Sequence, residues 1–317
     1  MPGIKPGMTE ERTRRQETRT GMIIQRQEDV TDVVVDAFGK TADPRTREIL
    51  IALVKHLHAF ARDVHLTEEE FQSAVNYVIQ LGQKTTATHN EAVLMSGSLG
   101  FSTLICLLNN GNKGQSETTA NLLGPFWRMN SPATANGGSI VRSPTPGPAL
   151  FVDAVVRDQA GQPIVGAEVD VWHSSPEGFY EQQDPKQAAM NLRGKFTTDA
   201  QGRFSFRSVK PAGYPIPIDG PVGDLVRATG RHHYRPAHLH FLIFKDGFKT
   251  LISQVYVNDD DRLETDVQFG VTRALVGNFV RHDGPAPAAD VTGPWYSLDQ
   301  AFAMEKGVAK LPKPPIQ

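Results

Sequence analysis

Cysteine is nearly absent from this sequence, which has one, Cys106, among its 317 residues. A single cysteine excludes a disulfide within the chain and is typical of proteins from a reducing compartment. Because Cys106 lies in the apolar run STLICLL, we predict that it is a small core residue and not a nucleophile.

The chain also lacks an excess of either charge, with 33 Lys and Arg against 35 Asp and Glu. This balance gives no electrostatic reason to expect nucleic acid or an anionic membrane as a partner. No early segment combines a basic start with an apolar core, and no apolar run approaches the ~18 residues of a membrane span. We therefore predict a cytoplasmic protein without a membrane span and without a nucleic-acid partner.

The N-terminal part of the chain has a helical pattern. Residues 1–28 are polar and charged, and we expect a mobile arm there. Asp43 followed by Pro44 predicts one helix N-terminus, and Thr67 with Glu70 predicts a second one that carries a capping box. Gly82 is suited to end the second helix. The first helix would have an apolar stripe formed by Leu50, Leu53, Val54, Leu57, Ala61 and Val64.

Residues 91–108, EAVLMSGSLGFSTLICLL, would be apolar on most faces of a helix. Such a segment is expected to be buried, within the chain or against another subunit. Gly97 and Gly100 would allow another backbone to approach it closely. We assign residues 29–128 to a helical domain.

The pattern changes in residues 128–149, where Pro, Gly, Ser and Asn dominate and indicate a loop or linker. Short β-branched and aromatic runs separated by turns follow, among them LFVDAVV, GAEVDVWH, HLHFLIF and LISQVYV. Several short strands joined by regular turns are typical of a β-sandwich. We therefore predict a mainly β protein, with a β-sandwich in residues 129–317 after the N-terminal helices.

The run YRPAHLHFLIF places two histidines one residue apart on a predicted strand. Alternation puts His238 and His240 on one face, with their backbones ~6.6 Å apart. From there both imidazoles can reach one metal ion. An isolated His-x-His pair is equally compatible with histidines that satisfy buried hydrogen bonds.

A metal ion would need further ligands, because two histidines alone make a weak site. The acidic run NDDDRLETD, Asn258 to Asp266, lacks the glycine of an EF-hand loop, and we interpret it as a solvated turn. Tyr180 and Tyr214 lie upstream, and a phenolate is a hard anionic ligand that favours Fe(III) over Zn(II) or Cu(I). Tyrosines beside Gly or Pro are also common as packing residues in loops, so the residues alone leave this choice open.

The stretch from Gly166 to Gln254 resembles the intradiol ring-cleaving dioxygenases, which are the catechol and hydroxyquinol 1,2-dioxygenases. The matching text is GAEVDVWHSSPEGFY, NLRGKFTTDAQGRFSFRSVKPAGYPIP, RPAHLHF and LISQVY, in the family's order and near its spacing. LLGPFW and the helical N-terminal half are also similar to that family. The resemblance therefore covers nearly all of the chain beyond residue 28.

The resemblance implies a β-sandwich that holds non-haem Fe(III). The implied ligands are Tyr180, Tyr214, His238 and His240, and Tyr214 would leave on substrate binding and act as a general base. The N-terminal helices would form the contact of a homodimer, where the family often binds a phospholipid.

Other residues near these ligands receive implied roles. Arg235 would stabilise negative charge on the ring while O2 reacts, although a salt bridge is its simpler role. Gln254 would orient the substrate or Arg235, or hold two strands together. His232 and His233 are expected in a loop beside the site, and His173 is expected to hydrogen-bond within the core.

The implied reaction inserts both atoms of O2 into an aromatic 1,2-diol and opens the ring between the hydroxyls. GYPIPIDGPVG and LLGPF are closer to the hydroxyquinol enzymes, so we predict that hydroxyquinol is opened to 3-hydroxy-cis,cis-muconate or maleylacetate. The predicted substrate pocket comprises Leu94, Gly97, Leu123, Gly124, Pro125, Phe126, Ile216 and Pro217.

The sequence departs from the hydroxyquinol pattern at Gly97, where those enzymes tend to have an acidic residue that can meet the third hydroxyl. Gln268, where an apolar residue is usual, is a candidate to supply polarity instead. Three other functions stay open: cleavage of catechol or a substituted catechol to a cis,cis-muconate, a non-catalytic β-sandwich that binds zinc or copper through His-x-His, and a structural protein whose helices dimerise.

Overall fold

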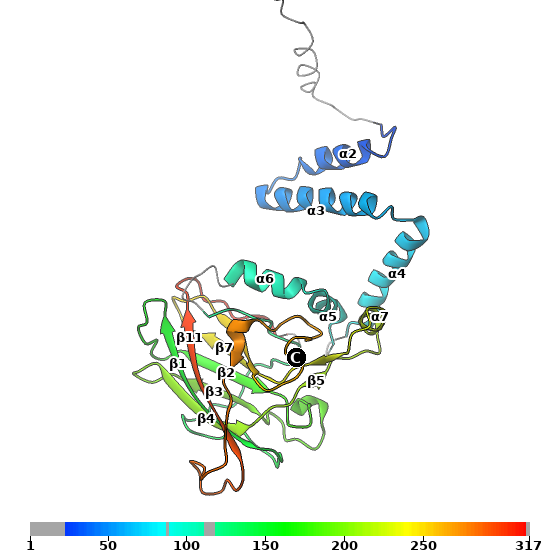
Figure 1. The fold of residues 1–317 in the computed structure, drawn as a ribbon. Coiled ribbons are helices and arrows are strands. Elements are labelled where there is room, and N and C mark those ends of the chain that lie inside the picture. The colour runs from blue at the N-terminus through cyan, green and yellow to red at the C-terminus, as the bar shows by residue number, and fades with distance from the viewer. Residues whose placement is uncertain (1–22, 87–88, 111–117, 315–317) are drawn as a thin grey trace, which may run out of the picture. The chain divides into compact units, whose positions relative to one another are not determined.

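The computed structural model of the chain describes residues 23–86, 89–110 and 118–314 (Figure 1). The chain divides into two compact units, Met1–Asn76 and Tyr77–Gln317. Most of the predicted N-terminal arm, residues 1–22, lies outside the described residues. The predicted division at residue 128 rests on composition and stays a prediction.

The first unit contains helices α2, Asp29–Phe38, and α3, Pro44–Asp63. The predicted N-terminus of α3 is confirmed, because the Asp43 side chain accepts a hydrogen bond from the Thr46 backbone N–H at 2.7 Å. Of the predicted apolar stripe, Val54 is buried. Other apolar side chains are about half exposed, namely Ile49, Leu53, Leu57 and Phe60 of α3 and Val64, which directly follows the helix.

Helix α4, Glu68–Lys84, crosses the division between the units. Its predicted capping box is confirmed, because Thr67 and Glu70 each accept a hydrogen bond from the other's backbone N–H. The helix does not end at Gly82 as expected but continues to Lys84. A side chain at Gly82 would meet nothing within 4 Å, so nothing in the packing forces the helix to stop there.

Residues 91–108 form two helices instead of one continuous segment. Helix α5, Glu91–Ser98, and helix α6, Phe101–Asn110, meet at an angle of 78°. Gly100 lies between them with φ +71°, a left-handed conformation that glycine adopts at little cost. Among the described residues no single helix is long and apolar enough to cross a membrane, and this bent pair meets that test by length and composition only.

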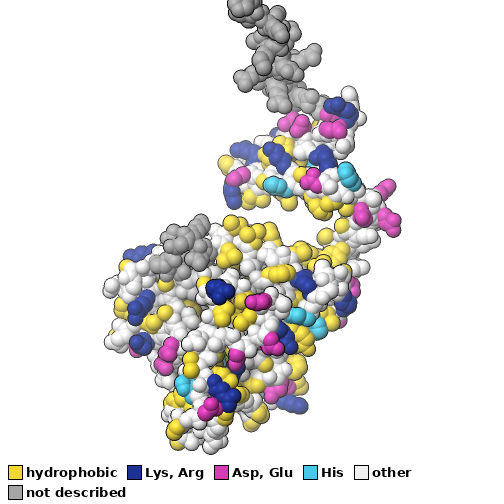
Figure 2. Space-filling model, in the orientation of Figure 1, with side chains coloured by type: hydrophobic (Ala, Val, Ile, Leu, Met, Phe, Trp, Pro, Cys, Tyr) yellow, Lys and Arg dark blue, Asp and Glu magenta, His cyan; other side chains and the backbone are white. Residues whose placement is uncertain are grey.

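Within the single chain this segment is only partly buried, and its burial against another subunit stays a prediction. Cys106 is half-buried rather than a core residue, and burial raises the pKa of its thiol. Figure 2 shows apolar side chains at the surface over α6. The exposed apolar residues of this segment are Val93, Leu99, Phe101, Leu104, Ile105 and Leu108.

Two packed sheets make up most of the second unit, and this arrangement confirms the predicted β-sandwich (Figure 1). The strand orders are β10-β11-β1-β4 in one sheet and β3-β2-β7-β8-β9 in the other, while β5 and β6 form a separate pair. The strands are β1 Ala149–Asp158, β2 Glu168–His173, β3 Arg193–Thr197, β4 Arg203–Val209, β5 Tyr214–Pro215, β6 Tyr234–Arg235, β7 His238–Phe244, β8 Leu251–Val257, β9 Val276–Gly277, β10 Val280–His282 and β11 Trp295–Met304. The connecting helices are α7, Pro221–Ala228, and the short η1, Glu181–Gln183, and η2, Arg273–Leu275.

Alternate residues of both sheets point inward and form one apolar core. The four-stranded sheet contributes Leu150, Val152, Ala154, Val156, Phe204, Phe206, Leu298, Phe302 and Met304. The five-stranded sheet contributes Val169, Val171, Phe196, Leu239, Phe241, Ile243, Leu251, Val255 and Val257. Because strand side chains alternate with a period of two, the residues that alternate with these core residues along each strand point to the outer face of the five-stranded sheet.

Candidate metal centre and substrate site

Strand β7 carries the two predicted histidine ligands on the outer face of the five-stranded sheet. It lies between β2 and β8, and both neighbours are antiparallel to it. Leu239 and Phe241 belong to the sandwich core, which confirms the predicted alternation. His238 and His240 are each 1% exposed on the opposite face.

Tyr180 and Tyr214 reach the same place from two loops. Tyr180 directly precedes η1, and Tyr214 begins the two-residue strand β5. The loops touch through bare backbone: a Cβ at Gly178 would lie 3.0 Å from the carbonyl oxygen of Gly213 and 3.5 Å from the Cβ of Tyr214. Gly178 has φ +83°, so only glycine fits this close turn without strain.

The four side chains converge. Nε2 of His240 lies 3.0 Å from the hydroxyl oxygen of Tyr180 and 3.1 Å from Nε2 of His238. The Tyr214 ring is 5.4 Å from the Tyr180 ring and 5.5 Å from the His238 ring between centroids. The structure thus brings together the four predicted ligands.

Hydrogen bonds and burial prepare the imidazoles to act as ligands. Nδ1 of His238 donates to the carbonyl oxygen of Pro236 at 2.7 Å, which leaves the lone pair on Nε2. Burial, followed by the nearby Arg235 cation, lowers the pKa of His238 to about 3. Burial and then His238 also lower the pKa of His240, so both rings are neutral near pH 7.

The spacing and charge of these nitrogen and oxygen atoms suit binding of a metal cation. Two nitrogens that each lie about 2.1 Å from one ion are roughly 3 Å apart, as the two Nε2 atoms are. Burial, with Tyr214 beside it, raises the pKa of Tyr180, so a positive charge would be needed to hold it as a phenolate. Among the described residues no group of three or more His, Cys, Asp and Glu side chains is arranged for a metal. The tyrosine–histidine set is therefore the candidate metal centre in this part of the chain.

A buried ion pair fixes the segment that carries Tyr180. Glu181 accepts from Nε of Arg193 at 2.8 Å and from Arg128 at 2.9 Å. The Tyr180 ring is stacked on Phe126, with centroids 4.2 Å apart. Breaking such a buried pair by removing one partner is strongly destabilising, so this tyrosine is held firmly.

Arg235 lies beside the centre and is 3% exposed. Its backbone pairs with that of Tyr214 across β5 and β6. Its Nε and Nη2 donate to the carboxylate of Asp266, and Nη2 also donates to the Tyr256 hydroxyl at 2.6 Å and to Gln254 at 3.1 Å. In the described part of the chain Nη1 makes no hydrogen bond, so its two N–H groups are available to a ligand.

Arg235 therefore forms the salt bridge that was its simpler predicted role, with Asp266, and it also lies beside the candidate ligands. Burial alone would raise the pKa of Asp266, but Arg235 and two backbone N–H groups outweigh it and lower this pKa. Asp266 is 4% exposed, so the interpretation of NDDDRLETD as a solvated turn is wrong at its last residue. The carboxylate is inside because it neutralises a buried guanidinium.

Gln254 occupies a fixed position opposite His240 in the β7–β8 register. Its Nε2 donates to the carbonyl oxygen of Leu122 at 2.8 Å, and its Oε1 accepts from Arg235 and Tyr256. It therefore both orients Arg235 and ties β8 to the segment before the site. His173 hydrogen-bonds to Ser208 within the sandwich, as expected.

The predicted substrate residues fall into two groups. Leu123 and Phe126 pack in one cluster with Tyr180 and Tyr214, and a Cβ at Gly124 would lie 3.0 Å from Cε1 of His240. Leu94 and Ile216 pack in a second cluster with Val267, and Gly97 lies under the Gln268 side chain. Pro125 is half-buried and Pro217 is exposed, and no described contact brings either to the ligands.

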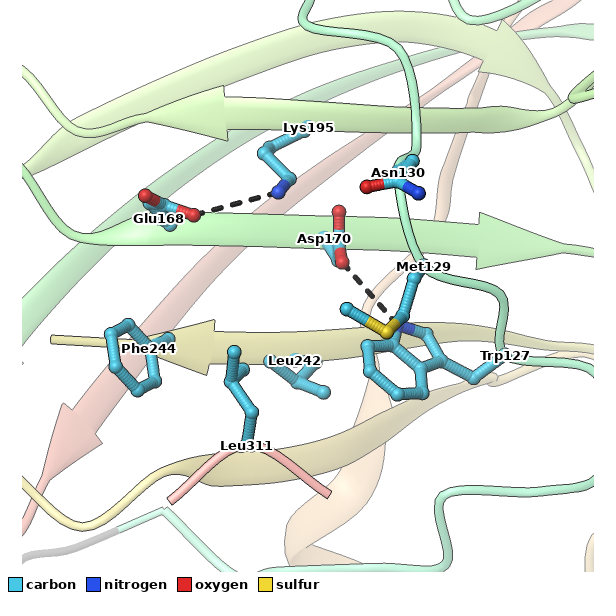
Figure 3. A pocket seen from close by; sticks show the side chains of 9 residues that line it. All are labelled: Trp127, Met129, Asn130, Glu168, Asp170, Lys195, Leu242, Phe244 and Leu311. Carbon is cyan, nitrogen blue, oxygen red and sulfur yellow. Dashed lines mark hydrogen bonds and ion pairs between the residues drawn. The ribbon is translucent and has the colours of Figure 1, made fainter. Parts of the chain in front are cut away.

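A separate pocket opens further along the outer face of β2 and β7, and Figure 3 shows Asp170 and Trp127 in its wall. Asp170 accepts from the Trp127 indole N–H at 3.3 Å, and burial raises the pKa of its carboxyl. The lining residues are Trp127, Met129, Asn130, Glu168, Asp170, Lys195, Leu242, Phe244 and Leu311. None of them is a predicted substrate residue, so this pocket is not the predicted one.

The chain that forms this sandwich and candidate centre matches two family models. Residues 122–295 match the model described as Dioxygenase, and residues 43–117 match Catechol dioxygenase N terminus. The chain belongs to the intradiol ring-cleavage dioxygenase family, whose members are oxidoreductases.

Individual relatives span most of the chain. Hydroxyquinol 1,2-dioxygenase of Rhizobium sp. is 38% identical over 83% of this chain and 90% of its own length. Catechol 1,2-dioxygenase of Candida albicans is 37% identical over 80% and 84%. The crystal structure of hydroxyquinol 1,2-dioxygenase from Pseudomonas putida superposes with a TM-score of 0.81 at 35% identity, covering 89% of this chain and 99% of that one.

Sequence reasoning missed several residues that build the site. Tyr256 and Trp172 face the same way as the histidines: Tyr256 pairs with His238 in the strand register, and Trp172 is stacked on His240 at 4.6 Å. Strand alternation from Gln254 would have pointed to Tyr256. No signal in the sequence marks Asp266, because it lies in one acidic run with Asp259 and Asp261, which are exposed in the structure.

Proposed function

We propose that this chain uses Fe(III) to open hydroxyquinol, benzene-1,2,4-triol, between its adjacent hydroxyls. Both atoms of O2 would enter the product, 3-hydroxy-cis,cis-muconate, which is the enol tautomer of maleylacetate. The observation that carries the proposal is the convergence of Tyr180, Tyr214, His238 and His240 beside Arg235. The hydroxyquinol-cleaving relatives support the choice of substrate.

Two tyrosines and two neutral histidines suit Fe(III), because phenolates are hard anionic donors and balance much of its charge. When bound at these four residues, Fe(III) would act as a Lewis acid that draws electron density from the diol. The side chains of the protein would move a proton from the diol and stabilise the charge on its ring.

The two tyrosines differ in how firmly they are held. Tyr180 is anchored through Glu181 and the stacked Phe126. Tyr214 sits on a strand of two residues. We assign proton removal from the diol to Tyr214, because it is the one whose support allows a movement away from the centre.

Arg235 meets the negative charge that develops on the ring. Asp266, Tyr256 and Gln254 hold its guanidinium in place before substrate arrives, so no reorganisation is needed during the reaction. The unused Nη1 donors are the groups that would contact the substrate.

The test is oxygen uptake with hydroxyquinol, catechol and their chloro and methyl derivatives, measured side by side with iron content. We expect a burgundy protein, since tyrosinate bound to Fe(III) absorbs visible light, and the fastest turnover with hydroxyquinol. Tyr214→Phe should lose most turnover and keep its melting temperature, whereas Tyr296→Phe, on the other sheet, should behave as wild type. A colourless, zinc-loaded protein without oxygen uptake would contradict the proposal.

Catechol is the second candidate substrate, and the Candida albicans relative favours it because its identity is nearly the same as that of the hydroxyquinol enzymes. Turnover of catechol without turnover of hydroxyquinol would select it. The assignment of the family and of the reacting side chains would then stand.

We also propose a homodimer through the N-terminal helices, with a phospholipid at the contact. Half-exposed apolar side chains on α3 and, separately, on α5 and α6 support it, because patches of this kind mark interaction surfaces. Sedimentation should give twice the chain mass, and Leu57→Glu should shift it to one chain. Organic extracts analysed by mass spectrometry should contain phospholipid, and extracts without any would contradict that part.

A further inference from the structure

The pocket on the outer face of the five-stranded sheet has an acidic floor. Asp170 lies in β2, and its strand-register partners are Lys195 on β3 and Leu242 on β7. All three side chains line the pocket, and Figure 3 shows Asp170 between Lys195 and Trp127. None of the candidate iron ligands lines it, so this pocket is a separate place on the same face of the sheet.

One oxygen of the Asp170 carboxylate has no hydrogen-bond donor. The residue is 7% exposed, and its Oδ2 accepts from the Trp127 indole N–H. Oδ1 is buried and accepts no hydrogen bond from the described part of the chain. Lys195 is paired with Glu168 instead, at 3.5 Å. Because buried carboxylate oxygens are rarely left without a donor, we expect a ligand to supply one here.

The charges around the pocket also call for a cation. Asp170 and Glu168 face a single positive side chain, Lys195, so the lining residues leave one negative charge uncompensated. Burial raises the pKa of Asp170, and Lys195, Trp127 and Ser131 offset that effect only in part. A positive charge beside Oδ1 would favour the ionised carboxylate and bring this pKa down again.

The remaining walls favour a short aliphatic chain. Trp127, Leu242 and Phe244 supply apolar surface, and Met129 and Leu311 are about half exposed where the pocket meets solvent. The cavity volume is about 60 Å³. An apolar cavity of ~150 Å³ takes up benzene, so this pocket is too small for an aromatic diol.

We propose that this pocket binds a small primary ammonium ion, with an N–H group donating to Oδ1 of Asp170 and a short alkyl chain against Trp127 and Leu242. A primary ammonium ion supplies both the donor that Oδ1 lacks and the positive charge that the lining residues lack. An anion would be repelled by Asp170 and Glu168, and an alcohol would bring the donor without the charge. The pocket shares no residue with the candidate metal centre, so the inference does not depend on the proposed function.

The experiment is a calorimetric titration of the purified, iron-loaded protein with n-propylammonium chloride. Sodium chloride is the control for ionic strength, and 1-propanol is the uncharged ligand of nearly the same shape. We expect a Kd of about 1 mM for the ammonium ion, as is reasonable for so small a ligand. The alcohol should bind at least about tenfold more weakly, because it makes no charged hydrogen bond.

Two variants should change the affinity in opposite directions. Asp170→Asn keeps the shape of the side chain and removes its charge, and it should weaken ammonium binding about tenfold. Lys195→Gln removes the competing cation from a partly exposed position, and it should tighten binding. Asp153→Asn changes an exposed carboxylate on the opposite sheet and should bind as wild type does.

Melting temperatures establish that each variant is folded. If Asp170→Asn does not fold, Lys195→Gln still decides the matter, because unchanged or weaker ammonium binding in that variant would overturn the inference. A wild-type protein that binds no ammonium ion, or that binds 1-propanol equally well, would overturn it too. A wild-type protein that binds the ammonium ion but turns over no diol would overturn the proposed function and leave this inference standing.

Discussion

The two faces of the five-stranded sheet are built from the same strands and have different roles, one in the hydrophobic core and one in the candidate metal centre. The inner face is apolar, with Val171, Leu239 and Phe241 fully buried in the sandwich core. The outer face carries His238 and His240, together with the residues that contact them. Side chains alternate along every strand, so the backbone position that fixes an inner residue also fixes its outer neighbour.

The difference shows how the candidate centre obtains its precision. A slip of one residue in β7 would put both histidines into the core and two apolar residues outside. The large hydrophobic cost of that slip fixes the register, and the register fixes the histidines. Stability is thus set largely on one face, and ligand geometry on the other.

His240→Ala should have the largest effect on activity and a small one on folding. It removes a ligand at the point where Tyr180 and His238 meet, so we expect iron content and oxygen uptake to fall to background. Iron analysis and uptake with hydroxyquinol check this, with the exposed His56→Ala as the control. Bound iron at one per chain in the variant would exclude His240 as a ligand.

Phe241→Ala tests the other face at the adjacent position. Its ring lies 4.8 Å from Phe302 of the opposing sheet, and loss of a buried phenylalanine costs about 3–5 kcal/mol. Urea unfolding should show this loss, whereas the protein that remains folded should bind iron normally. A stable variant without iron would mean that the two faces are not separable in this way.

His173 is a titratable side chain on the otherwise apolar inner face, and it should make the free energy of unfolding depend on pH. Burial lowers its pKa to about 4 from 6.5, so between these values the unfolded chain takes up a proton that the folded chain refuses. The free energy of unfolding should therefore decrease as pH falls through this window, by about 1.4 kcal/mol per pH unit for this residue. His173→Gln should have a shallower slope than wild type. Equal slopes for wild type and His173→Gln would show that His173 takes up its proton in the folded state.

Tyr256→Phe should have the smallest effect of the four. It removes one acceptor of Arg235 and the donor to Gln254, while Asp266 still holds the guanidinium. We expect kcat/KM to fall roughly tenfold, as for one hydrogen bond to a charged group, with unchanged iron content and visible band. A variant with full activity would remove Tyr256 from the set that positions Arg235.

Much of this arrangement could be predicted from local pattern. Alternation placed His238 and His240 on one face, and the residue types at Asp43 and Thr67 located two helix starts. Identification of Tyr180 and Tyr214 needed the family resemblance, because nothing local separates a ligand from a packing residue in a loop.

The parts that failed depend on distant contacts. Residues 91–108 looked like one buried segment, but a left-handed Gly100 divides them and leaves apolar side chains at the surface of the single chain. Asp266 became buried because Arg235, far away in the sequence, needed a counter-charge. The contact between Gly97 and Gln268 joins a helix to a loop, and no periodicity reports it.

The position of β11 has a consequence for biosynthesis. This last strand inserts between β10 and β1 and pairs in parallel with the whole of β1. A ribosome will therefore have released His240 well before Trp295 emerges to complete the opposing sheet. Until then the nascent sandwich stays open, and its aromatic interior, including Phe241, needs shielding from neighbouring chains.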